Sequence, residues 1–261
     1  MRYTLFIIIA LLTRFSLSAQ TDSLRLHSTL FAFGSANVYD SYLSPYSQTG
    51  IEARILRQTE RMTKLWSGRI SYHTEIDLNA SRTKNPARNV KTYAGGIRYS
   101  NAWLYNFSST RRLRTAAGLA ASAYAGCVYN ERNGNNPAQA KADLMLDLTG
   151  QAVYTFRLGR RQWSVRYRLA VPLVGLAFSP QYGQSYYEIF SLKDYDHNCV
   201  FANFINMPSM RHLLTLDIPV GHNIVRLGYA GEFMQSRWNG LRYHSYSHNV
   251  VVGFTKYFIR K

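Results

Sequence analysis

Residues 143–158 read DLMLDLTGQAVYTFRL, and apolar and polar side chains alternate along almost the whole stretch. The even positions carry leucine, glycine, alanine, tyrosine or phenylalanine, whereas the odd positions include Asp143, Asp147 and Arg157. Successive side chains of a β-strand point to opposite faces, so this stretch predicts a long strand with one apolar and one polar face.

The same alternation recurs along the chain after residue 20, and helical periodicity is almost absent. Turn-forming residues separate ten such segments. They cover residues 24–38, 48–62, 67–81, 90–107, 113–128, 140–158, 162–177, 210–220, 223–236 and 244–259. The connections near 63–65, 109–112, 159–161 and 221–222 are tight, and those at 39–47, 82–89, 129–139, 178–209 and 237–243 are longer.

Alternating tight turns and long loops on an even number of strands are typical of a bacterial outer-membrane barrel. We therefore predict an all-β fold, an antiparallel transmembrane β-barrel of about ten strands (roughly 8–12), with short periplasmic turns and long external loops. A soluble β-sandwich also alternates, but these segments are longer than the usual ~5–6 residues of globular strands. Aromatic residues near segment ends, such as Trp103 and Trp163, are typical of an interfacial girdle. The aromatic C-terminal strand resembles the segment read by barrel assembly machinery, so we expect that partner during insertion.

The N-terminus predicts a secretory signal peptide over residues 1–19. A basic start precedes an apolar run at residues 3–12, and small residues at 16–19 suit cleavage. Residues 20–261 then form a single barrel domain, which we expect in the outer membrane of a Gram-negative bacterium. No apolar run reaches the ~20 residues of a spanning helix, which excludes a polytopic helical membrane protein.

The chain is strongly basic, with 31 Lys and Arg against 14 Asp and Glu, for a net charge of +17. Cleavage would leave +15. The polar parity of each strand assigns eight acids, eight arginines and one histidine to the lumen. These residues are Glu52, Arg54, Glu60, Arg69, His73, Glu75, Asp77, Arg98, Arg114, Asp143, Asp147, Arg157, Arg166, Arg168, Asp217, Arg226 and Glu232. Such a lumen is charge-balanced and, lined by ion pairs, largely occluded; a narrow pore is the alternative.

The surplus positive charge falls on both rims of the predicted barrel. We expect outer-membrane lipids and lipopolysaccharide as partners of these rims. A nucleic-acid partner is not expected, because no basic recognition motif is present and the chain is exported. The sequence contains no metal-ligand spacing and predicts no cofactor or metal site.

Two groups of residues are candidates for catalysis. His73, Glu75 and Asp77 share one inward face, similar to the acidic and histidine groups of the omptin proteases, although no omptin motif is present. Ser247 and His248 open the last strand, where a lipid deacylase would place its nucleophile and base, but their spacing puts them on opposite faces. The alternative for the first group is a ladder of ion pairs with lumen arginines, and for the second a polar and aromatic girdle.

The longest loop, 178–209, predicts external recognition through Tyr182, Tyr186, Tyr187 and Tyr195, or a lid packed over the lumen. Cys127 and Cys199 both fall at the loop end of the barrel. The sequence allows two alternatives, a disulfide between them or two free thiols.

The stretch NGLRYHSYSHNVVVGF at 239–254 resembles the C-terminal signature of uncharacterised exported outer-membrane β-barrel proteins of Bacteroidetes type, a domain of unknown function. This resemblance implies location and fold but no reaction. The sequence thus favours a non-enzymatic barrel acting in envelope structure or surface binding. A barrel hydrolase and a narrow pore are the alternatives, and no ligand is predicted.

Overall fold

The computed structural model describes residues 24–110, 112–134, 136–221 and 223–259, and within them the chain forms one antiparallel sheet. The elements are β1(Leu24–Asp40), β2(Gln48–Met62), α2(Leu65–Gly68), β3(Ile70–Lys84), β4(Lys91–Ser109), β5(Leu113–Asn130), β6(Ala138–Leu158), β7(Arg161–Phe178), α3(Tyr186–Phe190), β8(Cys199–Asn203), β9(Met210–Val220), β10(Asn223–Trp238) and β11(Leu241–Ile259). The predicted signal peptide lies outside the described residues.

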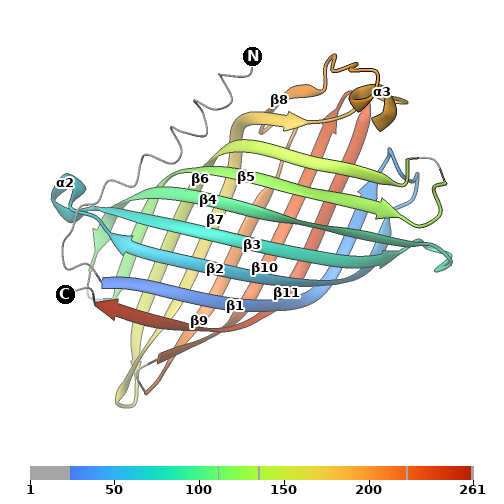
Figure 1. The fold of residues 1–261 in the computed structure, drawn as a ribbon. Helices are drawn as coiled ribbons and strands as arrows, with labels where there is room; N and C mark the ends of the chain where they lie inside the picture. The colour runs from blue at the N-terminus through green and yellow to red at the C-terminus, as the bar shows by residue number, and fades with distance from the viewer. Residues whose placement is uncertain (1–23, 111, 135, 222, 260–261) are drawn as a thin grey trace.

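Ten of these strands close into a barrel. Each strand from β1 to β7 pairs with the next, β7 pairs with β9, β9 with β10, β10 with β11, and β11 with β1. Figure 1 shows the tilted strands, with the start of β1 and the end of β11 at one end of the barrel. The predicted fold is confirmed, and the ten predicted segments coincide with β1–β7 and β9–β11 to within three residues at each boundary.

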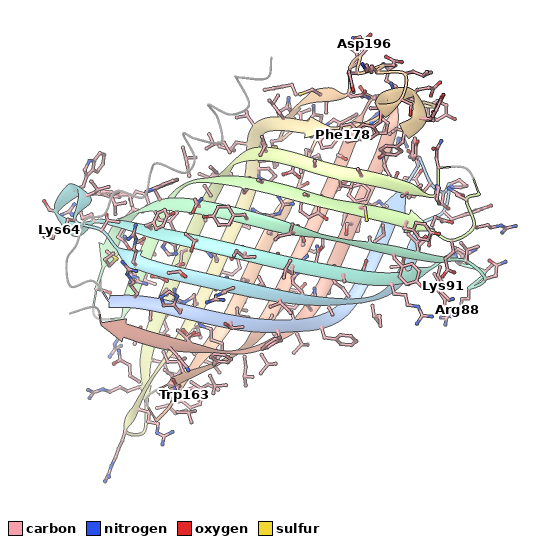
Figure 2. The ribbon with its side chains drawn as sticks, viewed as in Figure 1. Lys64, Arg88, Lys91, Trp163, Phe178 and Asp196 are labelled. Atoms are coloured by element: carbon pink, nitrogen blue, oxygen red, sulfur yellow. The ribbon has the colours of Figure 1, made fainter. Side chains whose placement is uncertain are left out.

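The alternation in sequence is an alternation between the lumen and the outer surface. On β6, Asp143, Met145 and Asp147 are inward and at most 7% exposed, whereas Leu144 and Leu148 are outward and about half exposed. The outer surface of the barrel is therefore apolar and the lumen is largely polar. Figure 2 places Lys64 and Trp163 at the end with tight turns, and Arg88 and Lys91 at the opposite end. We call these the turn end and the loop end.

Two connections differ from the sequence prediction. The β10–β11 connection is a two-residue turn, Asn239-Gly240, rather than a loop over 237–243. Both residues have positive φ, 49° and 76°, which is the conformation that Asn-Gly favours in a tight hairpin. The β2–β3 connection is longer than predicted, because residues 63–69 include the short turn α2 before β3 begins.

A bulge on β7 also changes the predicted parity. Val171 and Pro172 pair with Leu148 and Asp147, but the next pair joins Val174 to Leu146, so Leu173 is an extra residue. Beyond the bulge, Val174 and Leu176 face outward and are 42% and 49% exposed. This end of β7 pairs with the short strand β8, which the sequence did not predict, and β9 pairs with the other end of β7. In the described part of the chain, no helix has the length and hydropathy needed to cross a membrane.

Candidate functional site

The lumen is crossed by a network of ion pairs centred on Arg54. This β2 side chain is 4% exposed, and it lies 3.3 Å from Glu52 and 3.2 Å from Asp77, measured between nitrogen and oxygen. It also donates a hydrogen bond to Glu232 of β10. Two strands separate β2 from β10 around the ring, so the contact between Arg54 and Glu232 ties different walls of the barrel together.

Arg98 of β4 extends this network to the opposite wall. Its guanidinium lies 3.2 Å from Asp143 of β6 and 3.9 Å from Glu232. The same guanidinium stacks over the ring of Tyr124, 4.6 Å from the ring centre. Buried arginines with several carboxylate or aromatic partners hold fixed positions, because each planar guanidinium has five donors to satisfy.

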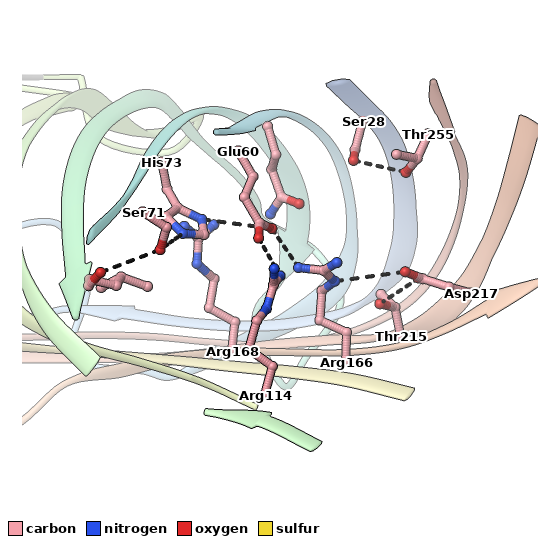
Figure 3. A network of polar contacts seen from close by, with 12 residues as sticks. Ser28, Glu60, Ser71, His73, Arg114, Arg166, Arg168, Thr215, Asp217 and Thr255 are labelled. Carbon is pink, nitrogen blue, oxygen red and sulfur yellow. Dashed lines mark hydrogen bonds and ion pairs between the residues drawn. The ribbon is translucent and has the colours of Figure 1, made fainter. Parts of the chain in front are cut away.

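A second cluster surrounds Glu60 near the turn end (Figure 3). Arg114 and Arg166 donate to its two carboxylate oxygens at 2.5 and 2.6 Å, and His73 Nδ1 lies 4.0 Å away. Arg166 also lies 3.7 Å from Asp217, which accepts a hydrogen bond from Arg226 at 2.9 Å. These contacts join β2, β5, β7, β9 and β10 in the lumen.

Two further pairs lie between these clusters. Arg168 donates to Glu75 at 3.0 Å, and Arg211 donates to Asp147 at 2.5 Å. Arg211 is absent from the lumen residues predicted from the sequence, although it shares the odd parity of Asp217 along β9 and could have been assigned inward on that basis. Among the described residues, the network contains eight carboxylates and seven arginines.

Two predicted members lie outside this network. Arg69 precedes β3 at the turn end and donates to the Tyr105 hydroxyl at 2.9 Å, on the exposed side. Arg157 has inward parity but lies near the end of β6, where its side chain is exposed, and the ion pairs of the described residues do not include it. Alternation predicts which face of a strand a residue occupies, but not how far the residue lies from the end of the barrel. Arg69 and Arg157 are both predicted to face the lumen for this reason, although they lie at its turn end.

The first group of candidate catalytic residues forms ion pairs and hydrogen bonds with neighbouring side chains. Glu75 pairs with Arg168, Asp77 pairs with Arg54, and His73 Nε2 lies 2.9 Å from the Ser71 hydroxyl. The arrangement is thus the ion-pair ladder rather than an open acidic cleft.

The second candidate pair is divided by the sheet itself. Ser247 faces the lumen and is 1% exposed, whereas His248 faces outward and lies 2.5 Å from the Tyr229 hydroxyl. The two side chains therefore do not form a nucleophile and base. Among the described residues, no group of three His, Cys, Asp or Glu side chains could hold a metal ion.

An apolar layer lies above the ion pairs at the loop end. Val38 of β1, Leu43 of the following loop, Val128 of β5 and Tyr243 of β11 form one buried cluster. Five strand positions separate β5 from β11 in the ring of ten, so these residues meet across the lumen. Lys141 and Asp40 form a 2.9 Å ion pair beside this layer. Two small cavities, of about 50 and 20 Å³, lie among the ion pairs below.

The long loop covers this layer from outside. The Tyr42 hydroxyl donates to the Gln184 carbonyl at 2.9 Å, and the Ala140 N–H donates to the Tyr186 hydroxyl at 2.5 Å. Burial raises the pKa of Tyr186 to about 12. The Tyr182 N–H also donates to the Asn239 carbonyl in the β10–β11 turn. The long loop is thus hydrogen-bonded to the β1–β2 connection and to the β10–β11 connection. We call residues 179–198 the lid.

The lid is ordered by a capping box at the start of α3. The Ser185 hydroxyl accepts from the Glu188 N–H, and the Glu188 carboxylate accepts from the Ser185 N–H at 2.6 Å. The Ser185 N–H and the Ser185 hydroxyl both donate to the Glu188 carboxylate, and these two hydrogen bonds lower its pKa.

The four predicted loop tyrosines divide into two groups. Tyr182, Tyr187 and Tyr195 are 78%, 65% and 58% exposed. Tyr186 instead turns inward, where its ring contacts those of Tyr42 and Phe178. The loop thus combines a packed lid with an exposed aromatic surface.

The two cysteines are free thiols, so the disulfide is not formed. Cys127 pairs with Ala140 of β6, and Cys199 pairs with Phe178 of β7. The cysteines thus lie on β5 and β8, three strand spacings of about 4.8 Å apart, whereas a disulfide needs Cα atoms within roughly 7 Å.

Comparison with known proteins adds the following similarities. A family model described as "Protein of unknown function (DUF3316)" matches residues 3–261. The chain is similar in fold to Neisserial surface protein A, with 11% identity over 89% of this chain and 97% of that chain and a TM-score of 0.35. For the translocator domain of the autotransporter NalP from Neisseria meningitidis, identity is 10%, coverage 98% and 96%, and the TM-score 0.41. For an outer-membrane channel from Pseudomonas putida F1, identity is 8%, coverage 94% and 98%, and the TM-score 0.37. No curated protein matches the sequence.

Proposed function

The chain belongs to the DUF3316 family of proteins of unknown function, and we propose that it is a small, non-enzymatic outer-membrane barrel with an occluded lumen. Its role would lie in envelope structure and in surface binding through the exposed aromatic side of the lid. The observation that carries this proposal is the arginine and carboxylate network that joins opposite walls of the lumen.

The outer surface supports placement in a membrane. Outward side chains of neighbouring strands form an apolar band, with Phe31, Ile55 and Leu78 each 44–48% exposed to the surroundings of the barrel. A soluble protein rarely exposes so continuous an apolar surface. We infer that a cleaved signal peptide delivers the chain, and that the loop end faces outside because β1 begins and β11 ends at the turn end.

Occlusion is supported at two heights. The ion pairs fill the middle of the lumen, where the cavities of about 50 and 20 Å³ hold at most a few water molecules. Above them, the apolar layer of Val38, Leu43, Val128 and Tyr243 and the overlying lid close the loop end. An ion crossing the barrel would have to separate both sets of contacts.

Surface binding is supported by side chains that the lid does not use for its own packing. Tyr182, Tyr187 and Tyr195 are each more than half exposed. Tyrosine side chains give large contact areas at low entropic cost, which suits recognition of a partner outside the cell.

Planar-bilayer recordings of the purified chain test occlusion. We expect no resolved single-channel steps for the unmodified protein, and stable steps for a variant in which both closures are weakened. Arg54→Ser and Arg98→Ser weaken the ion pairs, and Leu43→Ser, Tyr243→Ser and deletion of residues 181–197 weaken the apolar layer and the lid. Tyr187→Ser is the matched control, because its side chain is exposed and outside the packed layer. Open-channel steps in the unmodified protein would refute the occluded lumen and favour a pore.

Location and orientation are tested with Cys199 in intact cells of a Gram-negative host, using a membrane-impermeant maleimide. Cys199 is an exposed thiol at the loop end, so we expect labelling without permeabilisation. Labelling that requires a broken outer membrane would place the loop end in the periplasm. A chain recovered as a soluble periplasmic protein, without a heat-modifiable shift on gels, would exclude the membrane barrel.

A further inference from the structure

A basic groove lies on the outer face of β2 and β3 at the loop end. It has a volume of about 510 Å³, and its charged lining consists of Arg82, Lys84 and Arg88. The remaining lining includes Thr49 and Ile51 of β2. All three cationic side chains are exposed, so they are available to a ligand that approaches from the membrane surface.

The three cations make no ion pair with the described part of the chain. Within the residues that the structure describes, no carboxylate lies within ion-pair distance of Arg82, Lys84 or Arg88, and none lines the groove. Elsewhere on the loop end, the cation of Lys91 is paired with Glu131 at 3.5 Å. Three like charges in one groove repel one another, and an anionic ligand would relieve that repulsion.

The connecting loop holds this arrangement in a defined shape. The Asn85 side-chain oxygen accepts hydrogen bonds from the N–H groups of Asn89 at 3.0 Å and Val90 at 3.2 Å. The Arg88 N–H donates to the Asn85 carbonyl at 2.9 Å, with Arg88 at a φ of 57°. The loop is thus closed on itself before any ligand binds, which reduces the ordering cost of binding.

The height of the groove identifies the chemistry of its ligand. Strand register places Arg82 opposite Ile51, and the next outward positions toward the turn end are Ala53 with Ala80 and Ile55 with Leu78. Ile51, Ile55 and Leu78 belong to the exposed apolar band. The cations therefore begin where the apolar band ends, which is the level of lipid headgroups, and arginine and lysine bind phosphate well.

A second groove in the same sector of the rim repeats the pattern. It has a volume of about 640 Å³ and lies on the other side of the β1–β2 loop, near Pro45 and Ser47. Its lining includes Arg237 and Arg242, which are direct register partners on β10 and β11. Like charges opposite one another destabilise a strand pair, so a second anion-binding position is consistent with this geometry.

We propose that the groove of Arg82, Lys84 and Arg88 binds the phosphate groups of a phosphorylated saccharolipid in the outer leaflet, of the lipid A type. This proposal rests on the proposed membrane location and orientation, and it adds a specific ligand class and site. The acyl chains of such a lipid would lie along Ile51, Ile55 and Leu78, while its phosphates contact the three cations.

Native mass spectrometry of the full chain in phosphatidylcholine nanodiscs tests this site, with bisphosphorylated lipid A as the probe. The test variant is Arg82→Gln, Lys84→Gln, Arg88→Gln. At roughly fivefold in affinity per cation, the triple variant should bind the probe on the order of a hundredfold more weakly. The matched control removes three exposed cations at the turn end, through Lys64→Gln, Arg112→Gln and Arg160→Gln, and should retain the unmodified affinity.

Three results would overturn the proposal. These are unchanged affinity in the test variant, an equal loss in the control variant, and equal binding of lipid A from which both phosphates have been removed. A soluble sugar bisphosphate that competes as strongly as lipid A would assign the groove to a free phosphate instead of a lipid. Conductance and maleimide labelling of the same variants test the proposed function separately. A closed, correctly oriented barrel that does not bind lipid A would refute the proposed lipid site and leave the proposed function standing.

Discussion

Replacing Arg54 with methionine should destabilise the barrel strongly, because three carboxylates depend on this one side chain. Arg54 is 4% exposed and contacts Glu52, Asp77 and Glu232 in the lumen. Removing one partner of a buried ion pair typically costs about 3–5 kcal/mol, since the remaining charge is left without compensation. Glu232 retains Arg98 at 3.9 Å and Glu52 retains Asn249 at 2.8 Å, but Asp77 has no second cation within ion-pair distance in the described lumen.

Reversible urea unfolding in lipid vesicles, followed by tryptophan fluorescence, measures this effect. We expect Arg54→Met to lower the free energy of unfolding by about 3–5 kcal/mol and the double variant Arg54→Met, Asp77→Asn to recover most of it. Arg157→Met is the control, because this exposed arginine lies outside the network; its effect should stay within about 0.5 kcal/mol. A loss below about 1 kcal/mol for Arg54→Met, or a double variant no more stable than the single one, would show that these ion pairs do not determine the stability of the lumen.

The lid and the thiols give three further predictions. Tyr186→Ala should increase hydrogen exchange in residues 179–198, because it removes the acceptor of the Ala140 N–H and three ring contacts, whereas Tyr187→Ala should leave exchange unchanged; equal effects would contradict the assigned packing. The lowered pKa of Glu188 means that its capping box stabilises the lid above the usual pKa of 4.5 and loses that effect as pH falls through the lower folded value. The protection factors of the lid amides, which correct for the slower chemical exchange in acid, should therefore fall on acidification, and Glu188→Gln should abolish this dependence. Without reductant, the denatured chain should migrate as its Cys127→Ser, Cys199→Ser variant does, and two maleimides should add per chain; a reductant-sensitive shift in monomer migration would reveal a disulfide.

Most of the barrel could be predicted because its determinants are local. In the stretch 143–158, the polarity of a residue indicates whether it faces the lumen or the outer surface. An alternation with a period of two separates polar and apolar side chains onto two faces only in a β-strand. Neighbouring segments with the same period must then pair, and tight turns leave little choice of partner. The family resemblance fits the family model that covers residues 3–261, and the bacterial source that it implied stays a prediction.

What the sequence could not supply depends on contacts between distant segments. The extra residue Leu173 is visible only in the pairing of β7 with β6, and its carbonyl accepts from the Phe204 N–H. This end of β7 pairs with β6 along one edge, and β8 pairs with its other edge. Likewise, Tyr186 and Tyr187 are adjacent and chemically identical, so the sequence does not show which of them packs inward. The contacts with Ala140 and Tyr42 determine that it is Tyr186.

The polar lumen and the basic exterior share one physical origin. A chain that crosses the inner membrane before it folds cannot contain a long apolar segment, and alternation satisfies this condition by placing a polar residue beside nearly every apolar one. Closure of the barrel then buries those polar residues, so the charged ones must compensate one another, and the network of eight carboxylates and seven arginines is close to neutral. The surplus of cations therefore has to lie outside the lumen. Arg82, Lys84 and Arg88 share a groove because the outer face above the apolar band is the place where a cation needs no carboxylate from the chain, provided that the membrane supplies the anion.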